Sequence, residues 1–169
     1  MSKEEHLRFI ISRYDNYYNG VNTKSAFFIS FNTFISGGIV TGYYGLITSK
    51  NIHFSFIETC IFLIPVLCGF ISTTLILLAV NPFLKSGNCP MRYRSHIFFG
   101  SVAETPLKEY EDEIEKQTDD DRIKDLTKQT HQLSIGLTRK FRFIRIATNF
   151  ILAEFLFLIP LLILIFKHL

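Results

Sequence analysis

Three long apolar runs dominate the pattern of hydrophobic and polar positions along this chain. They cover residues 25–47, 56–80 and 144–166, and a long polar segment separates the second run from the third. A helix rises about 1.5 Å per residue, so each run would span roughly 33 to 37 Å, more than the ~30 Å hydrocarbon core of a bilayer. The pattern predicts an all-α membrane protein with three transmembrane helices, organised as a single membrane domain over residues 1–169.

Three further patterns indicate how the helices pack. Apolar side chains recur every three or four positions in residues 4–21, so residues 1–24 are assigned to an N-terminal amphipathic helix on the cytoplasmic side. A similar seam begins at Ile123 and enters the third run, which predicts one helix of about 45 residues, half cytoplasmic stalk and half span. The seam needs cover from the N-terminal helix or from a second copy of the chain. Gly38 and Gly42 form a small-xxx-small face that would let another helix approach closely.

The polar segment over residues 81–143 carries turn and cap signals. Pro82 favours the end of the second helix, and residues 96–99 look like a short apolar strand within a loop. Thr105 and Pro106 predict the N-cap and the first position of a further helix.

Basic residues are distributed unequally between the polar segments. The first 24 residues hold four Lys or Arg, residues 48–55 hold Lys50 alone, and residues 81–143 hold eleven. The positive-inside rule therefore places the N-terminus and the long segment in the cytoplasm, with the short turn and the C-terminus outside.

Two polar side chains stand out inside the runs, Asn32 in the first and Glu154 in the middle of the third. A charged carboxylate at that depth costs ~2.5 kcal/mol or more. Glu154 is either a pore-lining or gating group, or a buried hydrogen-bonding partner of Asn32, Ser36 or Thr73. The sequence does not separate these alternatives.

No motif of an enzyme is present: the chain has no Gly-rich phosphate loop, no H-E-x-x-H and no G-x-S-x-G. We therefore assign no catalytic residue, no cofactor and no metal, and interpret Asp119–Asp121 as a solvated connector rather than a metal site. Arg92, Arg94 and His96 lie beside aromatic residues and could contact the phosphate of a nucleotide. Contact with the phosphates of anionic lipid head groups is the alternative that we favour.

Three ordered blocks of sequence resemble a known family. The first block reads Y-D-N-Y-Y-N-G-V-N-T-K-S-A-F from Tyr14, the second S-H-I-F-F-G-S-V-A from Ser95, and the third D-L-T-K-Q-T-H-Q-L-S from Asp125, with K-F-R following at Lys140. In this order they resemble the transmembrane domain of the Pycsar effector family, membrane proteins of bacterial anti-phage defence.

The resemblance implies a set of motif residues that contact a signal or a partner. They are Tyr14, Asp15, Asn22 and Lys24 of the first block, and Ser95, Phe98, Phe99 and Gly100 of the second. Ser101 stands where the family commonly has Asp, and no cyclic-nucleotide-binding domain follows the third run. A sensed ligand would therefore bind residues 81–143, an oligomer interface or a partner protein.

The function that the resemblance implies is a multi-pass effector of the bacterial inner membrane. A cyclic nucleotide from a partner cyclase, or a partner defence protein, would trigger it to form a homo-oligomer and disrupt the membrane, causing growth arrest or abortive infection. The alternative is a passive membrane anchor or assembly subunit for a cytoplasmic enzyme. A constitutive transporter would predict an internal repeat, which the sequence lacks. Membrane lipid is an expected partner, and a nucleic acid polymer is not.

Overall fold

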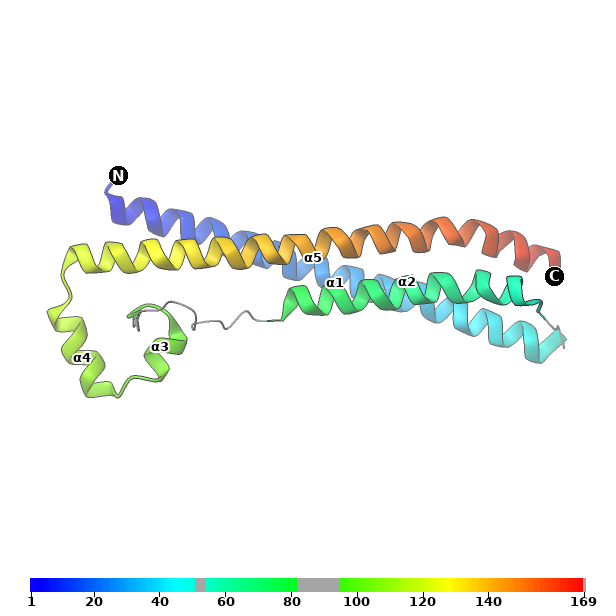
Figure 1. Cartoon of the computed structure of the whole chain (residues 1–169), viewed down its shortest axis with the longest axis horizontal. Coiled ribbons are helices and arrows are strands. Elements are labelled where there is room, and N and C mark those ends of the chain that lie inside the picture. Colours follow the sequence, from blue (N-terminus) through cyan, green and yellow to red (C-terminus); the bar gives the residue numbers. More distant parts are fainter. Residues whose placement is uncertain (51–53, 82–94, 169) are drawn as a thin grey trace. The chain divides into compact units, whose positions relative to one another are not determined.

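The computed structural model of the chain describes residues 1–50, 54–81 and 95–168. In chain order the helices are α1 (Lys3–Lys50), α2 (Phe56–Val80), α3 (Phe99–Ala103), α4 (Leu107–Lys116) and α5 (Asp119–His168) (Figure 1). Helices α1, α2 and α5 are long and apolar enough to cross a bilayer. The described residues contain no strand. The predicted all-α architecture with three spans is confirmed.

Helix α1 joins the predicted amphipathic helix and the first span into one helix of 48 residues. Ser2 caps it, because its Oγ accepts the N–H of Glu5 at 3.1 Å while the Glu5 carboxylate accepts the N–H of Ser2 at 2.7 Å. No proline interrupts residues 3–50. The predicted boundary between the amphipathic helix and the first run, at residue 25, is therefore not a helix end. It is a change from a polar to an apolar stretch within one helix.

Helix α5 confirms the prediction of one long helix that is half stalk and half span, and it extends over 50 residues. It begins at Asp119, so Asp119–Asp121 forms its first turn instead of the predicted connector. The Thr118 hydroxyl accepts the N–H of Asp121 at 3.2 Å and donates to its carboxylate at 2.6 Å. This bond lowers the pKa of Asp121, and acidic side chains are favoured at a helix N-terminus.

Two local predictions between α2 and α5 are wrong. Residues 96–99 form no strand, because a bend at 96 and 97 leads into α3, which begins at Phe99. Helix α4 begins at Leu107, and Pro106 occupies its N-cap with φ −58° and ψ 140°, outside the helical region. Thr105 does not cap α4, because its hydroxyl donates to the carbonyl of Ser101 at 2.9 Å.

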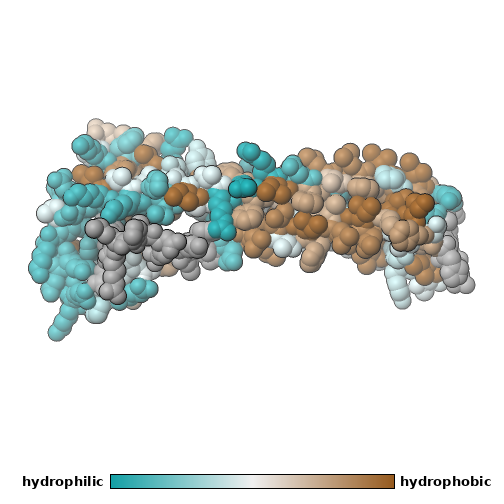
Figure 2. All heavy atoms as spheres, in the orientation of Figure 1, coloured by the Kyte–Doolittle hydropathy of each residue, from teal (hydrophilic) through white to brown (hydrophobic). Residues whose placement is uncertain are grey.

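The contacts divide the chain into two compact units, which we describe separately. The polar unit comprises residues 1–19 and 82–139, and the membrane unit comprises residues 20–81 and 140–169. On the face that Figure 2 shows, polar side chains predominate on the polar unit and apolar side chains on the membrane unit. Large apolar side chains of the membrane unit, such as Phe34, Phe70 and Leu156, are exposed, as expected of a surface that faces lipid.

Two apolar clusters form the core of the membrane unit. The first consists of Ile39, Phe62, Leu161 and Leu164, and the second of Ile76, Ala147 and Ile151. Along each span, the residues that separate the two clusters include small or polar ones. These residues form the candidate site.

Candidate functional site

A polar centre lies between the two apolar clusters of the membrane unit. It consists of Asn32 and Ser36 on α1, Gly69 and Thr73 on α2, and Glu154 on α5. Each pair is four residues apart and so shares one face of its helix. Asn32 and Glu154 are each only 1% exposed. All three spans therefore contribute to one buried polar layer.

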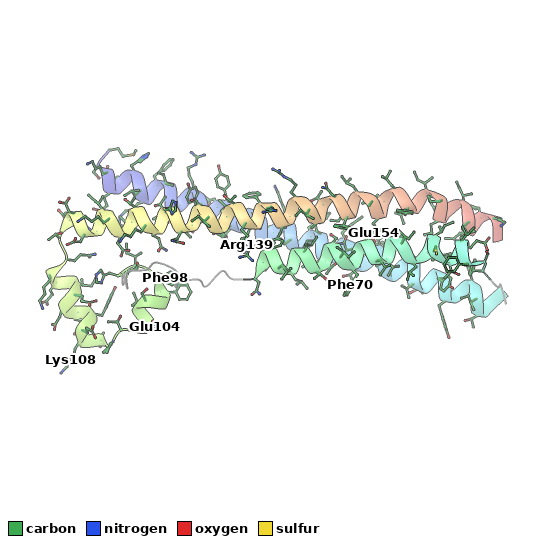
Figure 3. All side chains as sticks on the ribbon, viewed as in Figure 1. Phe70, Phe98, Glu104, Lys108, Arg139 and Glu154 are labelled. Atoms are coloured by element: carbon green, nitrogen blue, oxygen red, sulfur yellow. The ribbon has the colours of Figure 1, made fainter. Side chains whose placement is uncertain are left out.

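Hydrogen bonds cross this layer between different spans. The hydroxyl of Ser36 donates to Oε1 of Glu154 at 3.0 Å, which joins α1 to α5. The amide of Asn32 donates to the hydroxyl of Thr73 at 3.3 Å and, at a longer 3.5 Å, to the carbonyl of Gly69, which joins α1 to α2. In Figure 3 Glu154 lies on the side of α5 near α2. Phe70, which follows Gly69 in the sequence, lies on the outer side of α2.

Gly69 is the point where the side chains of the centre come closest to a backbone. A Cβ atom at this position would lie 2.4 Å from Oγ of Ser36 and 2.9 Å from Oε1 of Glu154. Real Cβ atoms do not approach other atoms so closely. The absence of a side chain on Gly69 therefore makes room for the bond between Ser36 and Glu154.

The polar centre is incompletely satisfied. Oε2 of Glu154 and Oδ1 of Asn32 are buried, and neither has a hydrogen-bond partner among the described residues. A buried polar atom without a partner costs about 1–3 kcal/mol. Of the two alternatives for Glu154, the interhelical hydrogen bond is present, with Ser36 as the partner. A role in a pore or gate stays a prediction.

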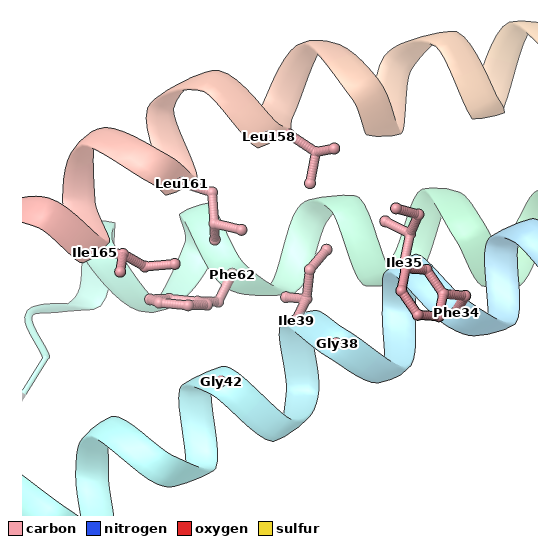
Figure 4. A pocket seen from close by; sticks show the side chains of 9 residues that line it. All are labelled: Phe34, Ile35, Gly38, Ile39, Gly42, Phe62, Leu158, Leu161 and Ile165. Carbon is pink, nitrogen blue, oxygen red and sulfur yellow. The ribbon is translucent and has the colours of Figure 1, made fainter.

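An apolar groove of about 190 Å³ opens elsewhere on the membrane unit, between side chains of α1, α2 and α5 (Figure 4). Gly38 and Gly42 line it, together with Ile39, Phe62 and Leu161. A methyl group at either glycine would meet no atom of the described residues within 4 Å. The small-residue face predicted from the sequence is therefore not covered by another helix of the same chain within the described part.

In the polar unit, the second block is bound to the third. The backbone N–H of His96 donates to Oδ2 of Asp125 at 2.8 Å, and Asp125 is 1% exposed. The hydroxyl of Tyr110 on α4 donates to the carbonyl of His96 at 3.0 Å. Oγ of Ser95 accepts the N–H of Phe98 at 3.0 Å, which closes a tight turn before α3. These bonds fix the start of the second block to α4 and α5.

The first block is bound to the third as well. The hydroxyl of Tyr18 donates to the carbonyl of Leu133 at 2.9 Å. A Cβ at Gly136 would lie 2.5 Å from that hydroxyl, so a glycine in α5 gives the phenol its space. Burial, and then the negative charge of Asp15, raise the pKa of Tyr18 above its usual value. The first and the second of the blocks that suggested the family therefore both contact the third in the polar unit.

The predicted motif residues of the first block all lie on α1. Tyr14 is half-buried, while Asp15, Asn22 and Lys24 are exposed. Asn22 and Lys24 belong to the membrane unit and the other two to the polar unit.

The aromatic part of the second block packs on itself. The rings of Phe98 and Phe99 lie 4.9 Å apart between centroids. A Cβ at Gly100 would lie 2.6 Å from the Phe98 ring, so the glycine allows a close contact. Phe99 remains 67% exposed.

The predicted phosphate cluster is described only at His96, since Arg92 and Arg94 lie outside the described residues. Nδ1 of His96 faces the carboxylate of Glu113 at 3.5 Å. The imidazole is therefore oriented toward an acidic group of α4. Binding of a nucleotide or lipid phosphate by this cluster stays a prediction.

Sequence reasoning missed the structural roles of Gly69, Tyr18, Tyr110 and Asp125. Asp125 opens the third block and precedes the buried seam residue Leu126, so its position next to the seam was the available signal. Gly69 carried no signal beyond being a small residue in a span.

Lys140, in the K-F-R that follows the third block, donates from Nζ to the carbonyl of Val80 at 3.2 Å, near the C-terminal end of α2.

The chain matches a known protein family. Residues 6–167 match the family model described as Pycsar effector protein domain. No curated protein and no solved structure matches the chain. The match extends over nearly the whole chain, and it confirms the resemblance that the three blocks suggested.

Proposed function

Because this chain belongs to the Pycsar effector protein domain family and is thereby a membrane effector of anti-phage defence, we propose that it oligomerises in the bacterial inner membrane and breaches that membrane when triggered. Growth arrest or abortive infection of the host cell follows from the breach. The N-terminus and the polar unit lie in the cytoplasm, and the C-terminus lies outside.

The observation that carries the proposal is the incompletely satisfied polar centre. Helices in lipid gain little from apolar contact with one another, so buried polar contacts and close packing hold a bundle together. Here two of the buried oxygens, on Asn32 and Glu154, lack partners among the described residues. A rearrangement that exposes these groups to water satisfies them. The closed bundle therefore has a built-in tendency to open along a hydrated path.

The trigger acts on the polar unit, where the first and the second block both contact the third. A cyclic nucleotide from a partner cyclase, or a partner defence protein, is the signal. Helices α1 and α5 contribute residues to both units. A signal that shifts either helix in the polar unit is thereby passed to the spans.

Oligomerisation is supported by the groove beside Gly38 and Gly42. Small residues allow helix backbones to approach closely in membranes, and the described part of the chain leaves this face uncovered. A span of a second copy fits such a face. Replacing Gly38 with Leu is expected to shift the full-length protein toward smaller species in chemical cross-linking of membranes, whereas replacing the equally open Gly37, on another face of α1, with Leu is not.

The experiment that tests the function measures uptake of a membrane-impermeant dye by induced cells. Wild-type protein, expressed with its genomic neighbours and challenged with phage, is expected to admit the dye and to collapse the membrane potential. A variant with Asn32→Leu and Glu154→Leu has no polar centre and is expected to reach the membrane but to admit much less dye. Glu58→Gln is the control, because Glu58 lies outside the centre and is bound to Lys167 at 3.0 Å. An intact membrane potential in the challenged wild type contradicts the proposal.

A passive anchor for a cytoplasmic enzyme is the second candidate. It is favoured by exposed apolar side chains on the polar unit: Phe99 is 67%, Leu107 70% and Ile114 41% exposed. An anchor predicts no dye uptake under any condition, and Glu154→Ala then changes only stability. It also predicts that Phe99→Ser together with Leu107→Ser releases a co-purifying enzyme while the protein stays in the membrane.

A further inference from the structure

The polar centre holds one carboxyl group and too few hydrogen-bond donors. Ser36 gives its single hydroxyl hydrogen to Oε1 of Glu154, which leaves Oε2 without a partner. Asn32 directs its amide N–H groups to Thr73 and Gly69, so its Oδ1 is an acceptor that no described residue satisfies. Two buried acceptors therefore require a hydrogen that the described side chains do not supply.

Within the described parts of the three spans, no basic side chain compensates a negative charge at the depth of Glu154. Residues 25–47 contain no Asp, Glu, Lys, Arg or His, and the only charged residue of α2 is Glu58. On α5 the basic residues that flank Glu154 in the sequence are Arg145 and Lys167, at the two ends of the span. Lys167 is bound to Glu58. A carboxylate at Glu154 would be buried with one hydroxyl donor and no cation.

Other titratable groups of the packed helices do not change this balance. The Cys68 thiol of α2 lies close enough to Glu154 to feel its charge, and a thiolate there would only add negative charge. Helix α1 offers the phenols of Tyr43 and Tyr44 within residues 25–47. Tyr43 packs against Phe54 and Phe62 at centroid distances of 5.3 Å and 4.8 Å, in the first apolar cluster.

We propose that Glu154 binds a proton in the closed bundle, donates that hydrogen from Oε2 to Oδ1 of Asn32 directly or through one water, and opens the bundle when the proton leaves to water. A proton supplies the missing donor and removes the uncompensated charge in one step. A metal ion is a poorer occupant, because hard cations take about six or more oxygen ligands and the centre offers two unpartnered ones.

The bound proton makes opening depend on pH. The closed bundle holds one proton more than an open bundle in which Glu154 meets water and ionises. Raising the pH therefore favours the open form. Burial of a carboxylate among apolar residues is strongly unfavourable, so the deprotonated side chain is driven toward water. This step rests on the proposed function, whereas the protonation of Glu154 does not.

Infrared spectroscopy of the full chain in lipid vesicles tests the proton directly. The wild type is expected to show the C=O stretch of a protonated carboxyl at neutral pH, and Glu154→Gln is expected to lose that band. Gln has nearly the same size and keeps both a donor and an acceptor, and gel filtration of the variant checks that it folds. Glu58→Gln is expected to retain the band. A spectrum of Glu154→Gln that still contains the whole band overturns the proposal.

Release of a trapped dye from the same vesicles tests the opening step. Wild-type release is expected to rise with pH, by up to about tenfold per pH unit, while release by Glu154→Gln stays low and independent of pH. Identical pH profiles for the two proteins overturn the opening step. Absence of release at every pH overturns the opening step but not the proposed function, because these vesicles contain no signal, and the infrared band still decides whether the proton is bound.

Discussion

The backbone N–H of His96 donates a hydrogen bond to Oδ2 of Asp125 at 2.8 Å, and this bond joins the second sequence block to the third. The carbonyl of His96 accepts the hydroxyl of Tyr110 at 3.0 Å, so both backbone groups of one residue are bound to side chains of α4 and α5. Asp125 thereby orders a segment that precedes the short helix α3.

Replacing Asp125 with Ala is expected to lower the free energy of unfolding by about 1–3 kcal/mol, because the N–H of His96 then loses its partner. Asp125→Asn keeps one acceptor oxygen and is expected to lose less. Thermal denaturation of the full chain in detergent measures both, and faster protease cleavage between residues 95 and 107 locates the change.

Asp112→Ala is the matched control for this prediction, because Asp112 is an exposed carboxylate on α4. It is expected to leave the melting temperature unchanged. If Asp125→Ala and Asp112→Ala melt together, the bond to His96 contributes no net stability.

Tyr18 and Gly136 are expected to be energetically coupled. A Cβ at Gly136 would lie 2.5 Å from the Tyr18 hydroxyl but 3.7 Å from its Cζ, so only the oxygen stands in the way. Gly136→Ala alone should destabilise the protein, despite the roughly 1 kcal/mol that Ala gains over Gly in a helix. In a Tyr18→Phe background the same change should stabilise it by about that amount.

A double-mutant cycle by chemical denaturation measures this coupling. Gly20→Ala is the control, because a methyl group there meets no atom of the described residues within 4 Å. If the effects of the two substitutions are additive, α5 can move away from the Tyr18 hydroxyl without a loss of stability.

Tyr18 should also make stability depend on alkaline pH. Its pKa is raised above 10.0 in the folded state, chiefly by burial, while the phenol of the unfolded chain ionises near pH ~10. The folded state therefore holds the proton to higher pH than the unfolded state. The stability linked to Tyr18 is fully present below pH ~10 and is lost as the pH rises through the folded value. The wild type should lose more stability than Tyr18→Phe over that range, and parallel melting profiles would contradict the prediction.

Sequence reasoning predicted the features that depend on long patterns. The three spans and the continuous α5 follow from runs of apolar residues and from a seam without proline, and Glu154 and Ser36 were recognised as candidate partners. What failed was short-range detail: Pro106 caps α4 instead of starting it, since its ψ of 140° lies outside the helical region. Apolar residues at 96–99 could not reveal that the Ser95 hydroxyl closes a turn there.

The glycines show why packing faces resist prediction from sequence. Gly38 and Gly42 fit a known helix-contact spacing, yet the described part of the chain leaves them open. Gly69 fits no such pattern and has the closest side-chain contacts of any glycine in the spans. Which glycine faces inward depends on the rotation of each helix, and the surrounding apolar residues give little direction in a span that is hydrophobic all round.

Gly69→Ala is expected to weaken the membrane unit by about 1–3 kcal/mol, as for other overpacked positions. The new methyl group would lie 2.4 Å from Oγ of Ser36 and 2.9 Å from Oε1 of Glu154, so it must separate these groups or push α2 away. Gly37→Ala, on an open face of α1, should instead be neutral or slightly stabilising. Melting temperature in lipid vesicles and dye release from the same vesicles measure the two variants.

Because the methyl group acts on the bond between Ser36 and Glu154, Gly69→Ala should leak without a trigger. If Gly69→Ala and Gly37→Ala have the same melting temperature, the three spans can move apart at the polar centre without a loss of stability. The polar centre would then not hold the bundle closed.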